Sequence, residues 1–414
     1  MRIAMLSYHT CPLAALGGKD TGGMNVYVRE LTRKLGRLGI QVDVYTRSQD
    51  EHAPHISHDL GYGNRVIHIP AGPEIPLPKP ELAAHIPTFV DEIIAFAEQK
   101  NFTYDLIHSH YWMSGLAAKE LKQKWDIPII HMFHTLGLMK QRIARNADEA
   151  EGDYRIQGEK DVIEATDVLV AATQAELAQL QWLYGVDDHK IVVIPPGVDT
   201  SHFYPIPPDE AKEFIGVPAK DRMLLFVGRI EPLKGIDTLI RAIAIMRESG
   251  LLDCQHLCMS IIGGEPQAGP ETMTEEMARL QAMREEHGLG DFVTFLGRRE
   301  QDTLPYYYSA SEAVIMPSHY ESFGMVALEA MACGTPVVAS LVGGLTFLVQ
   351  DGVTGFHFPV GDAESLSQHL VTLIDNRSVH DRMSEQATSL ARDYAWEKIT
   401  DRMATLYQEE IQDR

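Results

Sequence analysis

The sequence predicts an α/β protein with two doubly wound domains, and three observations support this fold class. Short apolar runs such as IAML, PIIHMF and VLVAA alternate with stretches of helical spacing, and near-continuous apolar strands are typical of parallel sheets that are covered on both faces. The alternation occurs twice, on either side of the stretch Ile194–Glu210, which is rich in proline and turn residues. The length of 414 residues suits two domains, each of roughly 200 residues with its own core.

In the first half, apolar runs predict strands that are separated by helices. The expected strands are, in order, Arg2–Tyr8, Gln41–Arg47, Arg65–Ala71, Leu106–Tyr111, Pro128–His134, Val168–Thr173 and Ile191–Pro196. The expected helices include Asn25–Leu38, Pro87–Gln99 and Ile156–Ala165. Strands that alternate with helices in this way predict a parallel sheet with helices on both faces.

The second half repeats the pattern and then ends in helix. The expected strands are Met223–Gly228, Met259–Gly263, Val293–Leu296, Ala313–Pro317, Pro336–Ala339 and Gly355–Phe358. The expected helices include Gly235–Ser249, Thr274–Glu286, Phe323–Ala332 and Ala363–Asn376, and the end, Val379–Arg414, is expected to be helical throughout. We place the boundary so that one domain covers residues 1–196 and the other residues 197–394. Ligands of such sheets bind at the carboxyl ends of the strands, so the cleft between the domains is the expected active site.

Composition narrows the class of protein. A formal net charge of −22 argues against nucleic acid and anionic membranes as general partners. The sequence has no run approaching the ~20 apolar residues of a transmembrane helix, and its start, MRIAMLSYHT, lacks the apolar core of a signal peptide. Cys11, Cys254, Cys258 and Cys333 form no CxxC pair and no disulfide framework, and Cys254 and Cys258 are expected to be packed thiols. We expect a cytoplasmic protein.

The stretch His319–Cys333, HYESFGMVALEAMAC, organises the second half. A buried strand is expected to end just before it, a short loop carries Glu321, and Gly324 opens a helix that bears Glu329. The unpaired N–H groups and positive dipole end of a first helical turn suit a phosphate or sugar oxygen, and Phe323 and Gly324 let the backbone approach a ligand. Two carboxylates that face one crevice would accept sugar hydroxyls. The alternative is a loop glutamate and a solvated helix glutamate.

Three further elements suit anions or close backbone approach. Arg229 and Lys234, in VGRIEPLKG, follow a strand and could hold a diphosphate; the alternative is surface charges beside a turn at Gly235. The pair Gly22–Gly23 precedes a helix and could bring N–H groups against an anion, or could form an ordinary loop. The strand end Ile261–Pro266, IIGGEP, offers another close approach.

Taken together, these elements resemble the retaining family-4 class of GT-B glycosyltransferases. The matching residues are Gly22–Gly23, Arg229 with Lys234, and Glu321 with Glu329 in an E-x7-E spacing around SFGM. The resemblance covers essentially the whole chain. It implies two facing Rossmann-like domains with a cleft between them, and a C-terminal helix, at about residues 395–414, that crosses back onto the first. It also implies that the first domain binds the acceptor and the second the nucleotide sugar.

The resemblance assigns roles at the donor site. Arg229 and Lys234 would bind the donor diphosphate, Glu329 the ribose hydroxyls and Glu321 the hydroxyls of the donor sugar. The remaining donor contacts would come from Gly23 beneath the diphosphate, from Arg298 beside the nucleobase, from the backbone of Phe323, Gly324, Met325 and Val326, and from His134, in MFHT, beside the sugar. The alternative for His134 is a satisfied histidine at a strand end.

The same resemblance implies transfer with retained configuration, in which the leaving phosphate assists the acceptor hydroxyl. The sequence offers no convincing protein nucleophile. It contains no Asp-x-Asp pair to clamp a metal ion, so positive charge on the leaving group is expected from Arg229, Lys234 and helix N-termini. We therefore expect a metal-independent enzyme that needs no cofactor. No motif demands pyridoxal phosphate, on which phosphorylases of this fold usually depend.

The acceptor side resembles a narrower group, the mycothiol-pathway glycosyltransferases that add N-acetylglucosamine to an inositol phosphate. In this resemblance a phosphomonoester would be held by two cations, Lys79 and Arg155, by the phenol of Tyr111 and by the hydroxyl of Thr135. Asn25 would contact the inositol. The alternatives are surface charges and strand-end residues. Sucrose-phosphate and sucrose synthases share much of this site, but they typically show GGQ where this chain has Gly22-Gly23-Met24.

The expected function is therefore transfer of a sugar from UDP-N-acetylglucosamine or UDP-glucose to a phosphorylated acceptor. Inositol phosphate is the first choice of acceptor and fructose 6-phosphate, as used by sucrose-phosphate synthase, is the second. A sugar-nucleotide binding protein without turnover is the alternative outside the enzymes. Homologues often dimerise, which leaves a homodimer open.

Overall fold

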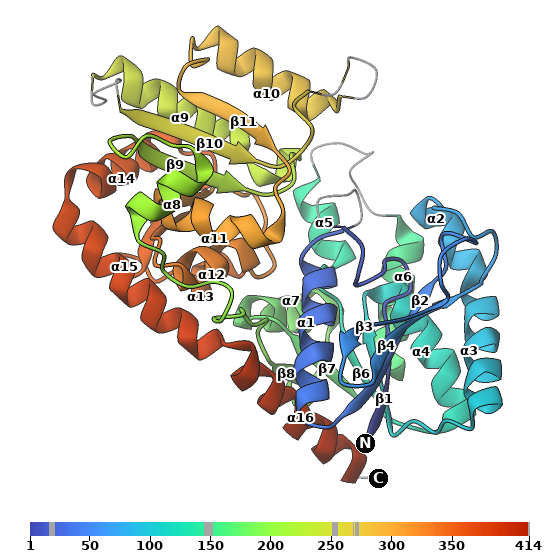
Figure 1. Ribbon diagram of the computed structural model, residues 1–414. Helices are drawn as coiled ribbons and strands as arrows, with labels where there is room; N and C mark the ends of the chain where they lie inside the picture. Colours follow the sequence, from blue (N-terminus) through green and yellow to red (C-terminus); the bar gives the residue numbers. More distant parts are fainter. Residues whose placement is uncertain (16–20, 145–151, 251–255, 268, 270–272, 413–414) are drawn as a thin grey trace. The chain divides into compact units, whose positions relative to one another are not determined.

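The computed structural model describes residues 1–15, 21–144, 152–250, 256–267, 269 and 273–412. The chain divides into two compact units (Figure 1). Unit 1 consists of Met1–Pro196 together with Trp396–Arg414, and unit 2 consists of Gly197–Ala395. Unit 1 is therefore built from two separate stretches of the chain, whereas unit 2 is continuous.

Unit 1 contains an eight-stranded sheet in the order β3-β4-β2-β1-β5-β6-β7-β8. The strands are β1 (Arg2–Leu6), β2 (Gln41–Arg47), β3 (Ile56–Gly61), β4 (Asn64–Ile69), β5 (Leu106–His110), β6 (Ile129–Met132), β7 (Val168–Ala171) and β8 (Ile191–Val193). All neighbours pair parallel except β3 and β4, which form an antiparallel hairpin at the edge. Chain order and spatial order diverge at β1, which lies between β2 and β5, so this is a doubly wound sheet.

Helices cover the sheet of unit 1. They are α1 (Gly23–Arg37), α2 (Lys79–Leu82), α3 (Ile86–Lys100), α4 (Trp112–Trp125), α5 (Gly137–Ile143), α6 (Asp153–Ala165), α7 (Gln174–Tyr184) and α16 (Trp396–Gln412). Helix α4 packs between α3 and α6, and α1 packs against α16. The core between helices and sheet includes Phe89 of α3, whose ring meets that of Tyr8 edge-on at 4.8 Å.

Helix α16 is held to unit 1 by buried aromatic and polar contacts, and Figure 1 shows it running beside α1. Trp396 packs edge-on against Tyr27 of α1 with ring centroids 5.4 Å apart. The hydroxyl of Tyr407 lies 2.6 Å from Nδ1 of His108 on β5. Both Trp396 and Tyr407 are at most 1% exposed, so the C-terminal helix is part of the core of unit 1.

Unit 2 contains a six-stranded sheet in the order β11-β10-β9-β12-β13-β14, in which every pair of neighbours is parallel. The strands are β9 (Arg222–Val227), β10 (Leu257–Ile262), β11 (Val293–Gly297), β12 (Ser311–Met316), β13 (Val337–Ser340) and β14 (Gly355–Phe358). The helices are α8 (Pro208–Ile215), α9 (Ile236–Glu248), α10 (Glu275–Glu286), α11 (Leu304–Ser309), α12 (Met325–Ala332), α13 (Leu345–Leu348), α14 (Ala363–Asp375) and α15 (Arg377–Ala391). Two parallel α/β units of this kind confirm the predicted fold class.

Two features differ from the expectation. The hairpin strand β3 was not predicted. The C-terminal segment is also not helical throughout, because α15 ends at Ala391, a 3-10 turn covers Arg392–Tyr394, and Ala395 is extended with ψ 136° before α16 begins. The backbone at the break pairs with a distant segment, since the N–H of Val198 donates to the carbonyl of Tyr394 at 2.8 Å. This break is where the chain leaves unit 2 and enters unit 1.

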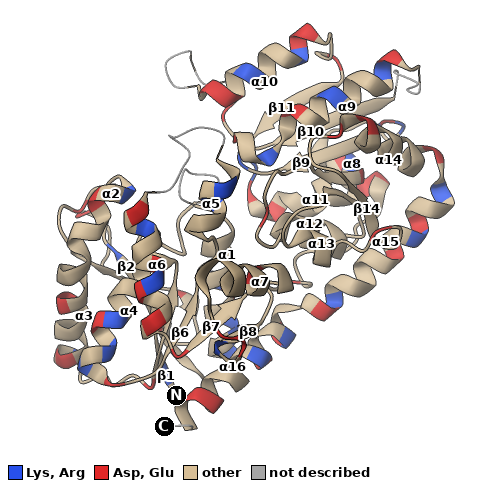
Figure 2. Cartoon of the chain, turned by 180° about the vertical axis from the view of Figure 1, so that it is seen from behind, with Lys and Arg blue, Asp and Glu red and all other residues tan. Residues whose placement is uncertain are grey.

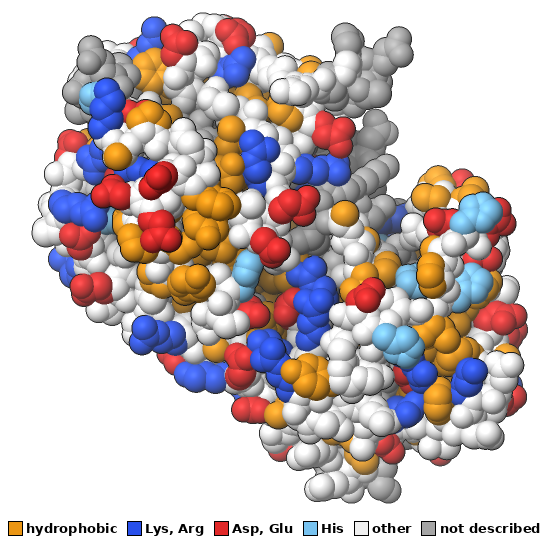
Figure 3. Space-filling model, viewed as in Figure 1, with side chains coloured by type: hydrophobic (Ala, Val, Ile, Leu, Met, Phe, Trp, Pro, Cys, Tyr) orange, Lys and Arg blue, Asp and Glu red, His pale blue; other side chains and the backbone are white. Residues whose placement is uncertain are grey.

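The surface carries charges of both signs and one aromatic patch. Acidic and basic positions are interspersed along helices such as α10 and α15 (Figure 2). Hydrophobic side chains gather over α8 and α11 (Figure 3), where Phe214, 57% exposed, stacks on Tyr306 at 3.8 Å. Cys11, Cys258 and Cys333 are free thiols, and Cys254 lies outside the described residues. Within those residues, no helix combines the length and the hydrophobicity needed to cross a membrane.

Candidate active site

In unit 2, two loops at the carboxyl edge of the sheet are pressed together, one after β9 and one after β12. Gly235 adopts a positive φ of 64°, and a Cβ at this position would collide with the carbonyl oxygen of Pro317. The N–H of His319 donates to the carbonyl of Leu233 at 2.8 Å. The turn glycine is therefore required by close packing of the two loops, which carry Lys234 and Glu321.

This packing brings together two residues that were predicted from separate motifs. Nζ of Lys234 lies 2.6 Å from Oε2 of Glu321, with side chains 21% and 16% exposed. Lys234 is thus not an isolated surface charge. An ammonium group has three donors, so this pair presents a cation and a carboxylate at one place, as a site for a sugar diphosphate needs.

The two arginines of the predicted donor site are more exposed. Arg229 lies two residues after β9, and its Nη1 contacts Oε1 of Glu231 at 2.8 Å. Arg298 follows β11 and pairs with Glu265 at 2.9 Å. Both arginines have more than two fifths of their side-chain surface exposed. Each guanidinium is therefore accessible to an anion from solvent.

The second glutamate of the E-x7-E spacing is buried. Glu329 lies on α12 and is 9% exposed, and Oε2 of its carboxylate accepts a hydrogen bond of 2.8 Å from the hydroxyl of Tyr308. The alternative of a solvated helix glutamate is therefore wrong. Gly324 precedes α12 with φ 103°, a conformation that favours glycine, and a Cβ here would lie 2.6 Å from Leu345.

Glycines that suggested close approach of a ligand serve the chain itself. A Cβ at Gly263, in the IIGGEP stretch, would collide with the carbonyl of Gly228, so this glycine allows the ends of β10 and β9 to pack. Gly343 and Gly344 likewise allow close packing against the loop that carries Glu321. The N–H of Gly344 donates to the carbonyl of Glu321 at 2.9 Å, and a Cβ at Gly343 would collide with that carbonyl. This second pair was not predicted, although the letters VGG were a signal for it.

In unit 1, the Gly22–Gly23 pair lies at the start of α1, as predicted. Nothing of the described chain lies within 4 Å of a Cβ placed on Gly22, and Gly23 is exposed. Asn25 is 1% exposed, and its Oδ1 accepts from the N–H of Gly22 at 2.9 Å. Both N–H donors of Asn25 are used within the chain, on Thr10 and on the carbonyl of Cys11, each at 2.8 Å. The structure thus shows Asn25 holding the loop after β1, and its contact with an acceptor stays a prediction.

The four residues predicted to hold a phosphate lie together in unit 1. Tyr111 directly follows β5 with a positive φ of 74°. Nζ of Lys79 lies 5.8 Å from the centre of its ring, and Cζ of Arg155 lies 5.1 Å from it. Nη2 of Arg155 donates to Oγ1 of Thr135 at 3.1 Å and to the carbonyl of Thr135 at 2.8 Å. Residues that are up to 76 positions apart in sequence therefore form one cationic cluster.

Arg155 is fully buried, so the alternative of a surface charge is wrong for this residue. Its Nε donates to Oε1 of Glu159, one turn later on α6, at 2.8 Å. Glu159 is also buried and accepts from the N–H of Gly137, at 2.9 and 3.0 Å, and from the hydroxyl of Tyr184. Buried charges need such partners. Glu159 was not predicted, although its spacing of four residues from Arg155 on a helix was a signal for this ion pair.

His134, which is half-buried, follows β6 with φ 61° and lies beside the buried His110. Its Nε2 lies 3.0 Å from Nδ1 of His110, and Tyr27 meets its ring edge-on at 5.3 Å. Burial lowers the pKa of His134 to about 3, and lowers that of His108 on the same sheet to about 3 as well. His134 is therefore neutral at pH 7. The contact with His110 is equally consistent with the alternative, in which His134 is a satisfied strand-end histidine. The position of His134 beside a donor sugar therefore stays a prediction.

Arg47, at the end of β2, fixes the loop that leads to Lys79, and it was not among the predicted residues. The side chain is 1% exposed and donates to main-chain carbonyls only: Nε to Ala71 at 2.8 Å, Nη1 and Nη2 to Ile75 at 3.1 and 3.2 Å, and Nη2 to Pro73. Burial lowers the pKa of this guanidinium. A buried cation that binds three carbonyls of one loop restricts that loop.

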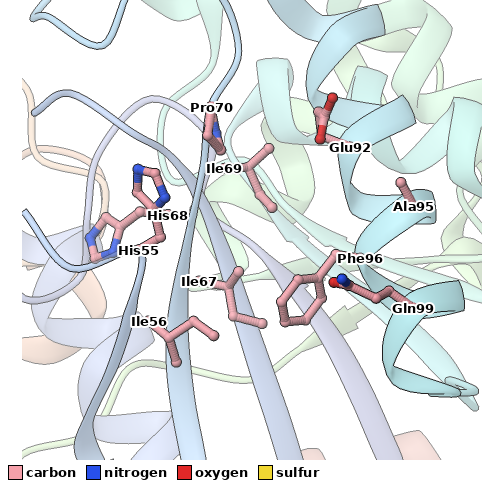
Figure 4. Close-up of a pocket in the computed structure, with 10 residues that line it drawn as sticks. All are labelled: His55, Ile56, Ile67, His68, Ile69, Pro70, Glu92, Ala95, Phe96 and Gln99. Atoms are coloured by element: carbon pink, nitrogen blue, oxygen red, sulfur yellow. The ribbon is translucent and has the colours of Figure 1, made fainter. Parts of the chain in front are cut away.

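The same loop is also held by His55, beside the β3–β4 hairpin. Figure 4 shows the groove between this hairpin and α3, in which Ile67 and Phe96 face each other while His55 and His68 lie on the other side of the strand. Nε2 of His55 lies 2.8 Å from Oε2 of Glu74 in the loop. Nε2 of His68 lies 3.3 Å from Sγ of Cys11, in the other loop that Asn25 holds. Among the described residues, no group of three or more His, Cys, Asp or Glu side chains is placed to hold a metal ion.

Comparisons with known proteins agree with this architecture. Two Rossmann-like parallel units define a GT-B glycosyltransferase fold. Residues 21–202 match the family described as Glycosyltransferase Family 4, and residues 208–390 match the family described as Glycosyl transferases group 1. The D-inositol 3-phosphate glycosyltransferase of Thermomonospora curvata is 38% identical over 416 residues, which cover 98% of this chain and 95% of that protein. The chain belongs to the family-4 glycosyltransferases.

Further relatives place the chain within that family. The D-inositol 3-phosphate glycosyltransferase of Kribbella flavida is 40% identical, over 96% of this chain and 92% of its own length. The sucrose-phosphate synthase of Thermosynechococcus elongatus has a similar structure, with a TM-score of 0.89, 32% identity and full coverage of both chains. The Anabaena protein HepE in complex with UDP, at 20% identity and a TM-score of 0.75, shares the fold over 99% of this chain and 100% of its own.

Proposed function

We propose that the protein transfers a sugar from a UDP-sugar to a phosphorylated acceptor, with inositol phosphate as the first choice. The observation that carries this proposal is the cluster of Lys79, Tyr111, Thr135 and Arg155 in unit 1. A phosphomonoester dianion is matched by two cations and by hydroxyl donors, and Glu159 holds the guanidinium of Arg155 in place.

Unit 2 would bind the donor. Lys234 and Arg229 would compensate the diphosphate, and Glu321, paired with Lys234, would accept from the hydroxyls of the sugar. Glu329 would take the ribose, and the other contacts would be those of Arg298, Gly23 and the backbone from Phe323 to Val326. The family relationship and the UDP that is bound to HepE support a nucleotide donor.

The proposed reaction retains configuration at the anomeric carbon and requires no metal ion. The bond from that carbon to the UDP oxygen breaks, the bond to the acceptor hydroxyl oxygen forms, and the hydroxyl proton passes to the leaving diphosphate. Lys234 and Arg229 would stabilise the charge that develops on the diphosphate. A neutral His134 is able to donate or accept a hydrogen bond at the sugar without adding charge. We further propose a cytoplasmic location and keep a homodimer as an open expectation.

Two acceptors remain in competition. The inositol 3-phosphate glycosyltransferases are 38% to 40% identical to this chain, and Met24 stands where sucrose-forming enzymes typically carry glutamine. The structural similarity to a sucrose-phosphate synthase, with 32% identity, favours fructose 6-phosphate as the second candidate. Both candidates share the phosphate, which the cluster in unit 1 would bind.

The test is UDP release by the purified protein, without added metal, in a crossed panel. The donors are UDP-glucose and UDP-N-acetylglucosamine; the acceptors are inositol 1-phosphate, inositol 3-phosphate, fructose 6-phosphate and their unphosphorylated forms. Turnover with one phosphorylated acceptor supports the proposal and identifies the substrate pair. Equal turnover with unphosphorylated acceptors would refute the phosphate cluster, and UDP-sugar binding without release would favour a binding protein.

A matched pair of variants tests the cluster itself. Lys79→Met should raise the acceptor KM and leave the donor KM unchanged. Lys119→Met is the control, because Lys119 lies on α4 in the same unit and pairs with Asp161 at 3.8 Å. If both variants raise the acceptor KM by the same factor, the effect is one of general charge and the assignment of Lys79 is wrong.

A further inference from the structure

Tyr308 of unit 2 has a buried hydroxyl that is aimed at a carboxylate of the proposed donor site. The residue lies on α11 and is 0% exposed. Its hydroxyl donates to Oε2 of Glu329 on α12 at 2.8 Å. Because the side chain is enclosed, Tyr308 does not itself reach a ligand in solvent, and any influence on a ligand passes through Glu329.

A second hydrogen bond fixes the position of this tyrosine. Oγ1 of Thr335, just after α12, donates to the carbonyl of Tyr308 at 2.7 Å, and the N–H of Thr335 donates to the carbonyl of Ala330 at 2.9 Å. The ring of Tyr308 also lies 6.1 Å from that of Phe203. Helices α11 and α12 are thus linked at two points, one through the main chain of Tyr308 and one through its hydroxyl.

The direction of the hydrogen bond is fixed by chemistry. Burial and the neighbouring carboxylate raise the pKa of Tyr308 well above its usual value, so the phenol keeps its proton and acts as the donor. A carboxylate has about four lone-pair directions on its two oxygens, so one bond from a phenol orients the group and leaves acceptor capacity. A bond to a charged group is stronger and more directional than one between neutral groups.

We propose that Tyr308 is a positioning residue of the donor site, which orients the Glu329 carboxylate toward the two ribose hydroxyls of the nucleotide. This inference rests on the proposed function, in which Glu329 binds the ribose. It predicts that loss of one hydroxyl, remote from the ligand, reduces the preference of the protein for a nucleotide with ribose hydroxyls. A purely structural role would weaken all nucleotides alike.

The experiment measures the Kd of UDP and of 2′,3′-dideoxy-UDP by isothermal titration calorimetry. The parent protein should bind UDP more tightly than the dideoxy analogue. Tyr308→Phe should weaken UDP by roughly tenfold, as expected for one lost hydrogen bond to a charged acceptor, and should change the Kd of the analogue by less than about twofold. Tyr306→Phe is the matched control on the same helix, because its ring stacks on Phe214, and it should leave both values unchanged.

A cycle with Glu329→Ala identifies the route. In that background both ligands should bind equally, and Tyr308→Phe should add nothing, since coupled residues are non-additive. Thr335→Val is the second variant, in case Tyr308→Phe does not fold. It keeps the phenol but removes the hydrogen bond to the carbonyl of Tyr308, so it should also reduce the preference for UDP over the dideoxy analogue. Equal weakening of both ligands by Tyr308→Phe, or an undiminished effect in the Glu329→Ala background, would overturn the positioning role. A parent protein that binds UDP without preferring it to the analogue would instead overturn the assignment of Glu329, and the inference with it.

Discussion

Mild acid should destabilise unit 1, because this unit encloses histidines that stay neutral. His108, His110 and His131 are 0% exposed. Burial lowers the pKa of His108 to about 3, and lowers those of His110 and His131 well below their usual value. An unfolded histidine has a pKa of about 6.5. Below that pH the unfolded state binds protons and the folded state does not. The free energy of unfolding is therefore highest above about pH 6.5 and decreases as the pH falls toward 3.

The size of the effect follows from the number of protons. At pH 5, each histidine that remains neutral lowers the free energy of unfolding by about 2 kcal/mol, and the four of this group, His134 included, by about 8 kcal/mol. Glu176 acts in the opposite direction, because burial raises its pKa to about 7. Its stabilising effect is full below about pH 4.5 and is lost as the pH rises to 7, so acidification to pH 5 restores about 2 kcal/mol. The net loss between pH 7 and pH 5 is about 6 kcal/mol, a large part of the ~5–15 kcal/mol of a typical domain.

Tryptophan fluorescence isolates this unit, because all four tryptophans belong to it: Trp112, Trp125, Trp182 and Trp396. Urea titrations at pH 7 and pH 5 give the two free energies of unfolding. His108→Gln, which keeps a partner for Tyr407, should recover about 2 kcal/mol of the loss. His52→Gln is the control, since its side chain is 87% exposed, and should recover none. A loss below about 1.4 kcal/mol would be less than the contribution of a single neutral histidine and would refute the reasoning.

Three further predictions follow from single contacts. Lys234→Ala should lower kcat/KM for sugar transfer by roughly 10²–10³, the usual cost of removing one stabilising donor, whereas Lys234→Arg should keep part of it; UDP release within fivefold of the parent would contradict the diphosphate role. Arg47→Met should raise the acceptor KM, leave the donor KM unchanged and lower the free energy of unfolding of unit 1 by roughly 2 kcal/mol; an unchanged acceptor KM would show that Arg47 does not set the Lys79 loop. Glu176→Gln keeps an acceptor for the N–H of Ala172 and removes the proton that offsets the histidines, so the stability loss from pH 7 to pH 5 should grow by about 2 kcal/mol; urea titrations of this variant measure it.

Much of the fold was predictable because its signals are local. Strands β6, β7 and β13 are buried along their whole length, so each is a largely apolar run with a helix on either side. Strand β3 gave no such signal, since its sequence ISHDLG lies half in solvent at the sheet edge. The break at Ala395 was also hidden, because no helix-breaking residue causes it and the pairing with Val198 comes from a segment almost 200 positions away.

In the candidate site, too, some residues could be predicted from local patterns and others could not. Lys234 and Glu321 were predicted because each follows a strand, and Glu329 because it lies eight residues after Glu321 on the helix that Gly324 opens, which is a pattern of spacing. The partners that hold these residues could not be found by spacing. Tyr308 gains its role only where α11 meets α12, and Arg47 only where the loop of Ala71 folds over the end of β2. Such contacts depend on how helices and loops pack in three dimensions.

Helix α16 has a consequence for how the protein is made. The ribosome releases residues 1–196 first, but Trp396 and Tyr407, which cover Tyr27 and His108, emerge only after all of unit 2 has been synthesised. Domains usually fold as they emerge, the N-terminal one first. Here the order is reversed: unit 2 has its complete sequence while the nascent unit 1 still exposes the face that α16 will cover. Residues 1–196 thus leave the ribosome before unit 2 but complete their own unit after it, so the face that α16 covers stays exposed for longer.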